Sequence, residues 1–208
     1  RKHFVVPAAC ADKEVLLHFE AVMGKQAVYV NGKLIEEHLG GYLPIQISLS
    51  DAGVKAGEKC VVAVKADNTG KPQYTLDFAY HGGIYRDVWL IARSKVGLTD
   101  PVEANREAAG GVFVHFANIS EASAEVYVKS ELENKSESTQ AVIVETTLKD
   151  AAGTVVDRHA QRATLKASAI SSVEQGFKVQ KPHLWSPDDP YLYRVETRIK
   201  ERKSGKAL

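Results

Sequence analysis

Carboxylates are the residues of this sequence best suited to catalytic chemistry, yet they are not arranged for it. General acid–base catalysis needs two groups positioned around one reacting bond. The acidic pairs Glu36-Glu37 and Asp188-Asp189 are sequence neighbours in turn-like stretches, which is typical of a solvated surface. We therefore predict no catalytic residue in this chain.

Histidines and cysteines show no metal-ligand spacing. The sequence lacks H-E-x-x-H, H-x-H and C-x-x-C motifs, and its seven histidines are scattered. Cys10 and Cys60 are predicted to be two small buried side chains, with a disulfide as the alternative. We predict no metal and no cofactor. The compartment stays open, with the periplasm or secretion among the alternatives.

The stretch HGGIYRDVWLI places an Arg-Asp pair between two glycines and an apolar run. Gly82 and Gly83 permit a tight, closely packed turn. We expect Arg86 to reach across a domain junction while Asp87 holds it or caps backbone amides, so that the pair is structural. A sugar contact by Arg86 is the alternative. Trp89 is expected to point into the core, with an exposed platform for a sugar as the alternative.

The elements that position these residues are strands, because apolar residues recur with a period of two. Asn31-Gly32 between apolar runs predicts a two-residue hairpin turn. No segment carries a helical stripe, so an all-β chain is predicted. The residues expected to share strand faces are Val15, Leu17 and Phe19; Cys60, Val62 and Val64; Val126, Val128 and Leu132; Val142, Val144, Thr146 and Leu148; and Tyr191, Tyr193, Val195 and Ile199.

The length and charge of the chain limit the classes of function that it can have. The chain has 208 residues, more than one ordinary β-module, and 27 Lys and Arg nearly balance 26 Asp and Glu. Without a basic block, a nucleic-acid partner is not expected. No apolar run approaches the roughly 18 residues of a membrane span. The start at RKHFVVP, without a methionine, reads as part of a longer polypeptide.

A domain boundary is expected near residues 93–104, where an apolar strand passes through Gly97 and Pro101 into polar sequence. The strands before it suit a jelly roll. The strands after it suit an immunoglobulin-like sandwich of about 100 residues. We predict domains at 1–94 and 95–208.

Three motifs in order resemble the non-catalytic N-terminal half of glycoside hydrolase family 2, the β-galactosidase and β-glucuronidase group. They are VYVNGKLIEEHLGGYLPIQISLSDAGVKAGEKCVVAVKADN, DFAYHGGIYRDVWLI and HLWSPDDPYLYRVETRI. The resemblance implies a galactose-binding-like jelly roll at 1–94, followed by an immunoglobulin-like sandwich at 95–208. It also implies that the opening strands of the jelly roll and the (β/α)8 barrel with both catalytic glutamates are not in this sequence.

Site residues follow from the resemblance alone. In the β-galactosidase branch an aspartate at the position of Asp77 lies on a loop that contacts the sugar in the barrel's pocket, and His81 is a weaker candidate. The Gly40-Gly41-Tyr42 turn is interpreted as structural, with unusual glycine dihedrals and a packed tyrosine. The segment LWSPDDPYLY is interpreted as the core and final turn of the second sandwich, through Trp185, Pro187, Pro190 and Tyr193.

Three functional classes remain at this stage. The first is a non-catalytic part of a family 2 glycosidase, most simply a β-galactosidase, whose partners are a β-glycoside and the barrel of the same polypeptide. The second is a free-standing carbohydrate-binding module, and the third is an adhesion or interaction protein. Only the first explains three glycosidase motifs in order.

Overall fold

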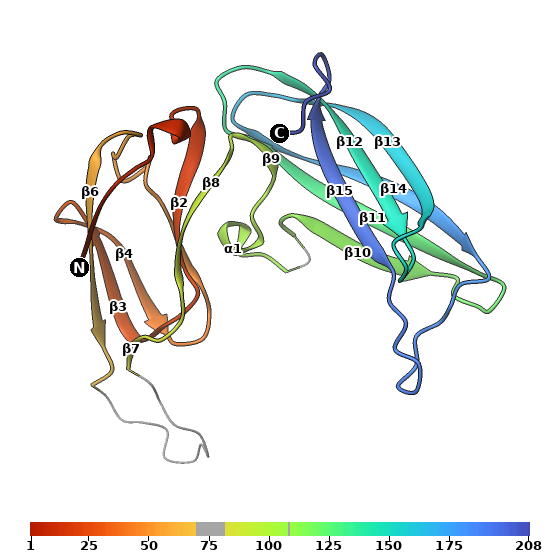
Figure 1. Ribbon diagram of the computed structural model, residues 1–208, viewed down its shortest axis with the longest axis horizontal. Helices are drawn as coiled ribbons and strands as arrows, with labels where there is room; N and C mark the ends of the chain where they lie inside the picture. The colour runs from red at the N-terminus through yellow and green to blue at the C-terminus, as the bar shows by residue number, and fades with distance from the viewer. Residues whose placement is uncertain (70–81, 108) are drawn as a thin grey trace. The chain divides into compact units, whose positions relative to one another are not determined.

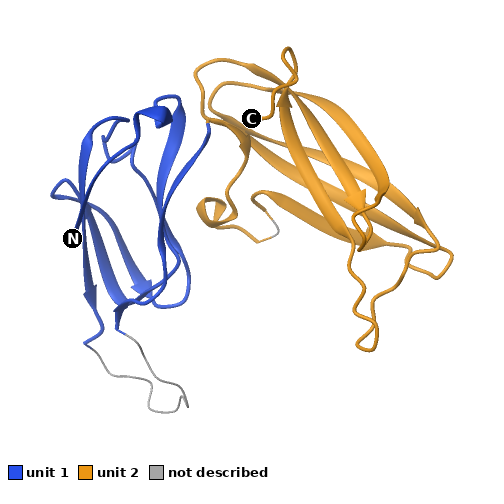
Figure 2. Ribbon diagram, viewed as in Figure 1, with its two compact units in different colours: residues 1–94 blue, residues 95–208 orange. Residues whose placement is uncertain are grey.

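Antiparallel β-sheets make up nearly all of the regular secondary structure in the residues that the computed structural model describes, which are 1–69, 82–107 and 109–208 (Figure 1). The chain divides into two units, Arg1–Ser94 and Lys95–Leu208 (Figure 2). The described helices are a single turn of α-helix, α1 (Pro101–Ala104), and a 3-10 turn, η1 (Ala8–Cys10). The predicted fold class, all-β with two successive sandwiches, is confirmed.

Two sheets face each other in the first unit. One has the order β1-β6-β3-β4, with β7 also pairing with β3, and the other has the order β5-β2-β8. Their strands are β1 (Lys2–Val5), β2 (Lys13–Phe19), β3 (Val22–Val30), β4 (Lys33–Gly40), β5 (Ile45–Ser48), β6 (Lys59–Asp67), β7 (Gly83–Ile84) and β8 (Val88–Ser94).

The hairpin between β3 and β4 forms as predicted. Asn31 and Gly32 have φ angles of 49° and 84°, the left-handed values that a two-residue type I′ turn requires. One expectation fails nearby, because Glu36 and Glu37 lie within strand β4 and not in a turn. Both side chains are exposed, as expected of a solvated pair.

The core of the first unit contains the residues that the alternation predicts, including Leu17, Phe19 and Val62. Cys10 and Cys60 are free and buried in the same core, and burial raises the pKa of the Cys60 thiol. The interpretation of both as small apolar side chains therefore agrees with the structure.

Trp89 does not point into this core, and that expectation is wrong. Strand β8 pairs with β2 so that Val88 and Leu90 lie opposite the core residues Phe19 and Leu17. Trp89 consequently lies on the other face of the sheet, where 51% of it is exposed. Its indole Nε1 donates a hydrogen bond of 2.8 Å to a carboxylate oxygen of Glu20.

The second unit is also built from two sheets. One has the order β10-β11-β14, with β9 also pairing with β11, and the other has the order β13-β12-β15. Their strands are β9 (Val96–Leu98), β10 (Val112–Ala117), β11 (Ser123–Asn134), β12 (Gln140–Lys149), β13 (Val155–Leu165), β14 (Ala169–Gln180) and β15 (Arg194–Glu201). Two apolar clusters fill the space between the sheets, one around Leu132 and Val144 and the other around Val128 and Leu148.

Asn134 links the two sheets of the second unit. It ends strand β11, is 1% exposed, and its amide nitrogen lies 3.1 Å from the carbonyl oxygen of Leu165 in β13 and 2.8 Å from that of Ser138. Its side-chain oxygen accepts a 2.9 Å bond from the Ser136 N–H. A short amide side chain thus satisfies main-chain groups that the sheets leave unpaired.

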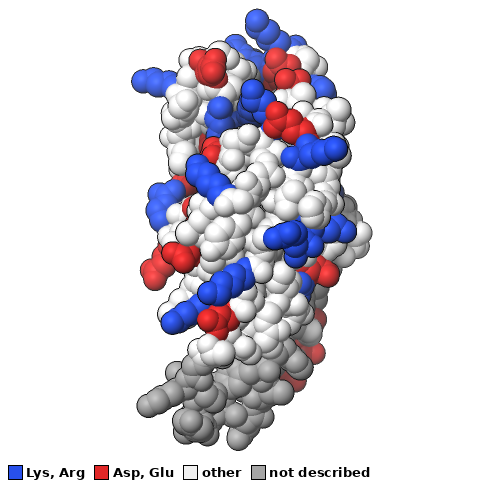
Figure 3. All heavy atoms as spheres, turned by 90° about the vertical axis from the view of Figure 1, so that its left-hand side faces the viewer, with Lys and Arg blue, Asp and Glu red and all other residues white. Residues whose placement is uncertain are grey.

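Charge and hydropathy agree with the sequence-based expectations. On the face that Figure 3 shows, Lys and Arg side chains are interspersed with Asp and Glu side chains and form no block of one sign. Within the described ranges, no helix is long and apolar enough to span a membrane.

Replacing Asn134 by alanine is expected to destabilise the second unit by about 2–3 kcal/mol, because several buried main-chain groups lose their partner at once. Thermal or urea unfolding measures the effect. Gln161→Ala is the matched control, since it removes an exposed amide side chain from β13. Equal stability of the two variants would contradict the linking role of Asn134.

Candidate functional site

The predicted sugar-contacting residue Asp77, and His81 beside it, lie outside the described residues. The site is therefore built from the residues that bracket segment 70–81. Strand β6 leads into the segment and strand β7 follows it, and both pair with β3. Asp67 lies opposite Lys25, and Gly83 lies opposite Met23. The points at which the chain leaves and re-enters the sheet are therefore two residues apart along β3.

Two glycines let the backbones at this base approach closely. A Cβ atom on Gly24 would lie 2.4 Å from the carbonyl oxygen of Asp67, and the φ angle of Gly24 is +92°. A Cβ atom on Gly82 would lie 2.5 Å from the side-chain nitrogen of Asn68. Gly83 has a φ of +78°. Gly83 has the left-handed φ expected of it, but it lies in strand β7 and has open space around its Cβ position, so the predicted close-packed turn is not seen in the described residues. The close backbone approach is at Gly24, which the hairpin pattern of the sequence did not reveal.

Hydrogen bonds order the exit from β6. A side-chain oxygen of Asp67 accepts bonds from the Thr69 N–H, at 2.9 Å, and from the Thr69 hydroxyl. These bonds, with smaller contributions from the charges of Lys65 and Lys25, hold the pKa of the Asp67 carboxyl below its usual value. Asp67 is thus an ionised cap for the residues that lead into the segment.

Gln26 ties three parts of the base together. Its side chain is 3% exposed, and its amide nitrogen donates to the carbonyl oxygens of Val22, of Gly24 at 2.8 Å and of Gly40 at 3.0 Å. Strands β3 and β4 are therefore joined by a buried side chain beside their main-chain bonds. Their shared end is a firm support for the segment that carries Asp77.

The turn Gly40-Gly41-Tyr42 is only partly as predicted. Neither glycine has a positive φ, and Tyr42 is 53% exposed, so the expected dihedrals and the packed tyrosine are both wrong. Gly41 is needed for space, because a Cβ atom there would lie 2.5 Å from the sulfur of Met23. The tyrosine that holds the turn is Tyr85, whose hydroxyl donates to the Gly41 carbonyl oxygen.

Arg86 and Asp87 are exposed and do not form an ion pair with each other in the described structure. The guanidinium carbon of Arg86 lies 5.5 Å from the ring centroid of Tyr85, a cation–π distance. The main-chain carbonyl of Asp87 accepts a 3.1 Å bond from the Glu20 N–H. The expected pairing of the two charges is therefore wrong: Arg86 lies over the Tyr85 ring, and Asp87 bonds to Glu20 through its main chain.

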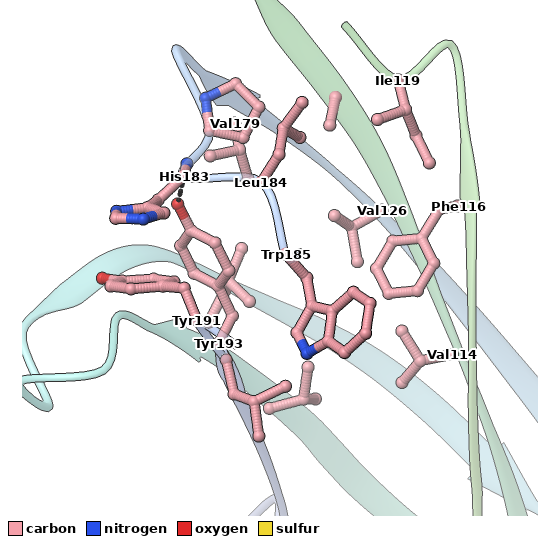
Figure 4. A pocket seen from close by; sticks show the side chains of 15 residues that line it. Val114, Phe116, Ile119, Val126, Val179, His183, Leu184, Trp185, Tyr191 and Tyr193 are labelled. Atoms are coloured by element: carbon pink, nitrogen blue, oxygen red, sulfur yellow. Dashed lines mark hydrogen bonds between the residues drawn. The ribbon is translucent and has the colours of Figure 1, made fainter. Parts of the chain in front are cut away.

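An aromatic groove in the second unit is the other candidate site. It has a volume of about 670 Å³ and opens at one end of the sandwich, where strands β10, β11 and β14 face β15 (Figure 4). Trp185, which was expected in the core, is 59% exposed and lines this groove. It belongs to the irregular segment 181–193, to which strand alternation does not apply.

The polar groups at the groove are engaged with one another. The Tyr193 hydroxyl accepts a 3.0 Å bond from the His183 N–H, and the His183 ring stacks on Tyr191 with centroids 4.0 Å apart. Nε2 of His183 lies 2.6 Å from a carboxylate oxygen of Asp189. Asp188 and Asp189 are exposed, so their arrangement is that of a surface turn.

Comparison with known families matches both units. Residues 1–94 match the family model described as "Glycosyl hydrolases family 2, sugar binding domain", and residues 111–208 match the model described as "Glycosyl hydrolases family 2". The chain belongs to glycoside hydrolase family 2. The resemblance that the three motifs carry is thereby confirmed.

The relatives in family 2 are named for more than one activity. A β-glucuronidase of Formosa agariphila is 31% identical over 97% of this chain and 21% of its own length. A β-galactosidase of Bacteroides ovatus is 31% identical over 96% of this chain and 22% of its own. The solved structure of Bacteroides uniformis β-glucuronidase 2, covalently bound to cyclophellitol-6-carboxylate aziridine, superposes with a TM-score of 0.87 at 28% identity. It covers 100% of this chain and 24% of that one.

The chain thus spans about a fifth to a quarter of the length of the family 2 relatives it matches. It corresponds to the N-terminal part of family 2 β-glucuronidases and β-galactosidases.

Gly24→Ala tests the close approach at the base of segment 70–81. It is expected to destabilise the first unit by roughly 3 kcal/mol or more, because a clash with the Asp67 carbonyl adds to the cost of a positive φ. Gly53→Ala is the control, since Gly53 has a φ of +82° and open space around its Cβ position. The control should lose only about 1–2 kcal/mol. Equal losses in chemical unfolding would show that the close approach carries no cost.

Proposed function

We propose that the two units are the non-catalytic N-terminal part of a longer retaining β-glycosidase. Retaining hydrolysis uses two carboxyl groups about 5–5.5 Å apart across the scissile bond, and the resemblance assigns both to a barrel. The observation that carries the proposal is the ordered match of two family 2 models to two β-sandwiches. The units support the barrel and contribute one loop to its pocket.

The glycon of the parent enzyme is galactose or glucuronate. A β-glucuronidase and a β-galactosidase match this chain with the same 31% identity, so the similarity does not favour the β-galactosidase expected from the sequence. The two sugars differ at C6, which is a hydroxymethyl group in galactose and a carboxylate in glucuronate, and in the configuration of the 4-hydroxyl. A cationic partner for the carboxylate would favour glucuronate, and the proposal assigns this selection to the barrel.

Asp77 is the residue that we propose to contact the sugar. Its support is the spacing to the GGIYRDV motif and the firm base formed by Gly24, Gln26 and Asp67. A carboxylate accepts hydrogen bonds from two neighbouring sugar hydroxyls.

The proposed domains are a sugar-binding jelly roll at 1–94 and an immunoglobulin-like sandwich at 95–208. The first unit has an apolar cleft of about 590 Å³. Core-type side chains such as Leu17, Phe19 and Val62 line it beside the half-exposed Val88 and Leu90. Among the described residues, strand β8 on its border pairs with only one neighbour, β2.

Activity assays test the proposal directly. The 208-residue chain should hydrolyse chromogenic β-galactosides and β-glucuronides no faster than the buffer blank, because the proposal assigns both catalytic carboxyl groups and the shaped pocket to the barrel. The longer parent should hydrolyse one of them with retention of the anomeric configuration. Turnover by the 208 residues alone, abolished by changing one of their carboxylates, would refute the non-catalytic role.

Asp77→Ala in the parent is expected to lower kcat/KM roughly ten- to hundredfold, which corresponds to losing a charged acceptor worth about 1.5–3 kcal/mol in a closed pocket. Asp188→Ala, an exposed turn carboxylate, is the control and should leave kcat/KM unchanged. In the 208-residue chain, Asp77→Ala should leave the melting temperature nearly constant. An unchanged kcat/KM in the parent would contradict the proposed contact between Asp77 and the sugar.

A further inference from the structure

The outer face of the sheet β13-β12-β15 is strongly basic (strands labelled in Figure 1). In β12, Val142, Val144 and Leu148 point into the core. The alternate residues of β12, and the residues of β13 and β15 paired opposite them, therefore lie on the outer face. The basic side chains at these outer positions are Lys149, Arg158, Arg162, Arg194, Arg198 and Lys200, and the acidic ones are Glu145 and Glu196. The outer face thus carries six positive and two negative charges.

The two carboxylates of this face are already engaged by lysines. Nζ of Lys200 lies 3.0 Å from a carboxylate oxygen of Glu145, and Nζ of Lys149 lies 2.7 Å from one of Glu196. These hydrogen bonds, and then the charges of the lysines and of nearby arginines, hold the pKa of both carboxyls below the usual value. Each carboxylate is therefore ionised and neutralises a lysine, so the excess positive charge belongs to the arginines.

Four exposed arginines provide this excess charge. Arg158 and Arg162 lie on β13, and Arg194 and Arg198 lie on β15. Arg198 is 64% exposed and lies 3.7 Å from Glu196, whereas the other three form no ion pair within the described residues. Residues four apart on a strand are about 13 Å apart, and two strands separated by a third are about 10 Å apart. The four guanidinium groups therefore span an extended patch that is longer than a single hexose.

The other sheet of the second unit does not share this charge pattern. On its outer face Glu125 lies opposite Lys178, and Lys129 lies opposite Glu174, so each positive charge faces a negative one on the neighbouring strand. The near balance of 27 basic and 26 acidic residues in the whole chain therefore hides a one-sided distribution. Solubility is satisfied by mixed charges, whereas an excess confined to one face indicates an anionic ligand.

The outer face of this sheet suits an anionic polysaccharide better than other polyanions. A guanidinium group donates two parallel hydrogen bonds to a carboxylate, which is the group that distinguishes a uronate from a neutral sugar. None of the outer positions of β12, β13 and β15, three strands that the structure describes throughout, is aromatic. These positions therefore offer no platform for nucleic-acid bases and lack the aromatic anchors that are typical of a protein interface.

We propose that the outer face of the sheet β13-β12-β15 binds a uronate-containing polysaccharide, with its four exposed arginines as the partners of the uronate carboxylates. This face recognises the charge and the extended form of the polymer. It belongs to the second unit, whereas the sugar contact proposed for Asp77 belongs to the first. The inference rests on the proposed function, since a β-glycosidase held on the polymer meets its substrate at a high effective concentration.

Titration calorimetry with hyaluronan, a polymer that contains β-linked glucuronate, tests the proposal in the 208-residue chain. Hyaluronan should bind at about 50 mM salt, and its Kd should rise roughly tenfold or more at about 500 mM salt, because salt screens exposed charges. Neutral dextran is the control and should not bind. The absence of hyaluronan binding at low salt, or equal binding of dextran, would overturn the proposal. A DNA duplex that binds as tightly as hyaluronan would overturn the assignment of the ligand to a polysaccharide.

A matched pair of double variants tests the location of the site. Arg158→Gln with Arg162→Gln removes two positive charges from the basic face and should raise the Kd for hyaluronan roughly fivefold or more. Lys129→Gln with Lys178→Gln removes two positive charges from the outer face of the other sheet and should change the Kd less than about twofold. Equal Kd values for the two double variants would overturn the location. Both should keep the Tm of the unchanged chain, because they alter surface side chains; if the first did not, the arginine pair of β15, changed to glutamine in the same way, repeats the test.

The activity of the longer parent separates this inference from the proposed function. Turnover of a chromogenic β-glycoside by a parent that does not bind hyaluronan would overturn the binding face and leave the proposed function standing. Hyaluronan binding by a parent that turns over no β-glycoside would uphold the binding face and refute the proposed function.

Discussion

The close approach of the Gly24 backbone to the Asp67 carbonyl fixes the point where the chain leaves and re-enters the first sheet. A separation of 2.4 Å between that oxygen and a Cβ at position 24 means that no side chain is accommodated there. With this contact in place, β6 and β7 flank the same end of β3, and Gln26 bonds the end of β4 to it. The described residues on either side of segment 70–81 thus lie at the same end of strand β3.

Much of the fold was predictable because antiparallel sandwiches follow two local rules. Period-two alternation identified core residues such as Phe19 and Val144, and Asn31-Gly32 identified a turn through its required positive φ angles. Both rules depend only on neighbours in sequence. Alternation predicts burial correctly wherever a second sheet covers the apolar face of the strand.

The errors arise where the structure depends on contacts that neighbours in sequence do not determine. Trp89 was assigned to the core from its apolar neighbours, whereas the register with β2 places Val88 and Leu90 inward. Trp185 was assigned to the core from its motif, yet it lies in an irregular segment. Close backbone contacts were equally hidden, because Gly41 and Gly24 are required by Met23 and Asp67, which no local pattern connects to them.

Some of the exposed apolar residues of each unit line a cleft or groove beside an edge strand. In the first unit Val88 and Leu90 border the cleft at β8, and in the second Phe116 and Trp185 border the groove near β15. A sheet edge with free main-chain groups beside uncovered core side chains is costly in water and prone to wrong pairing. Both costs fall when another strand or domain covers these places, since the main-chain groups then gain partners and the apolar side chains leave water. The apolar side chains at β8 and beside β15 are therefore the places where each sandwich gains most from being covered.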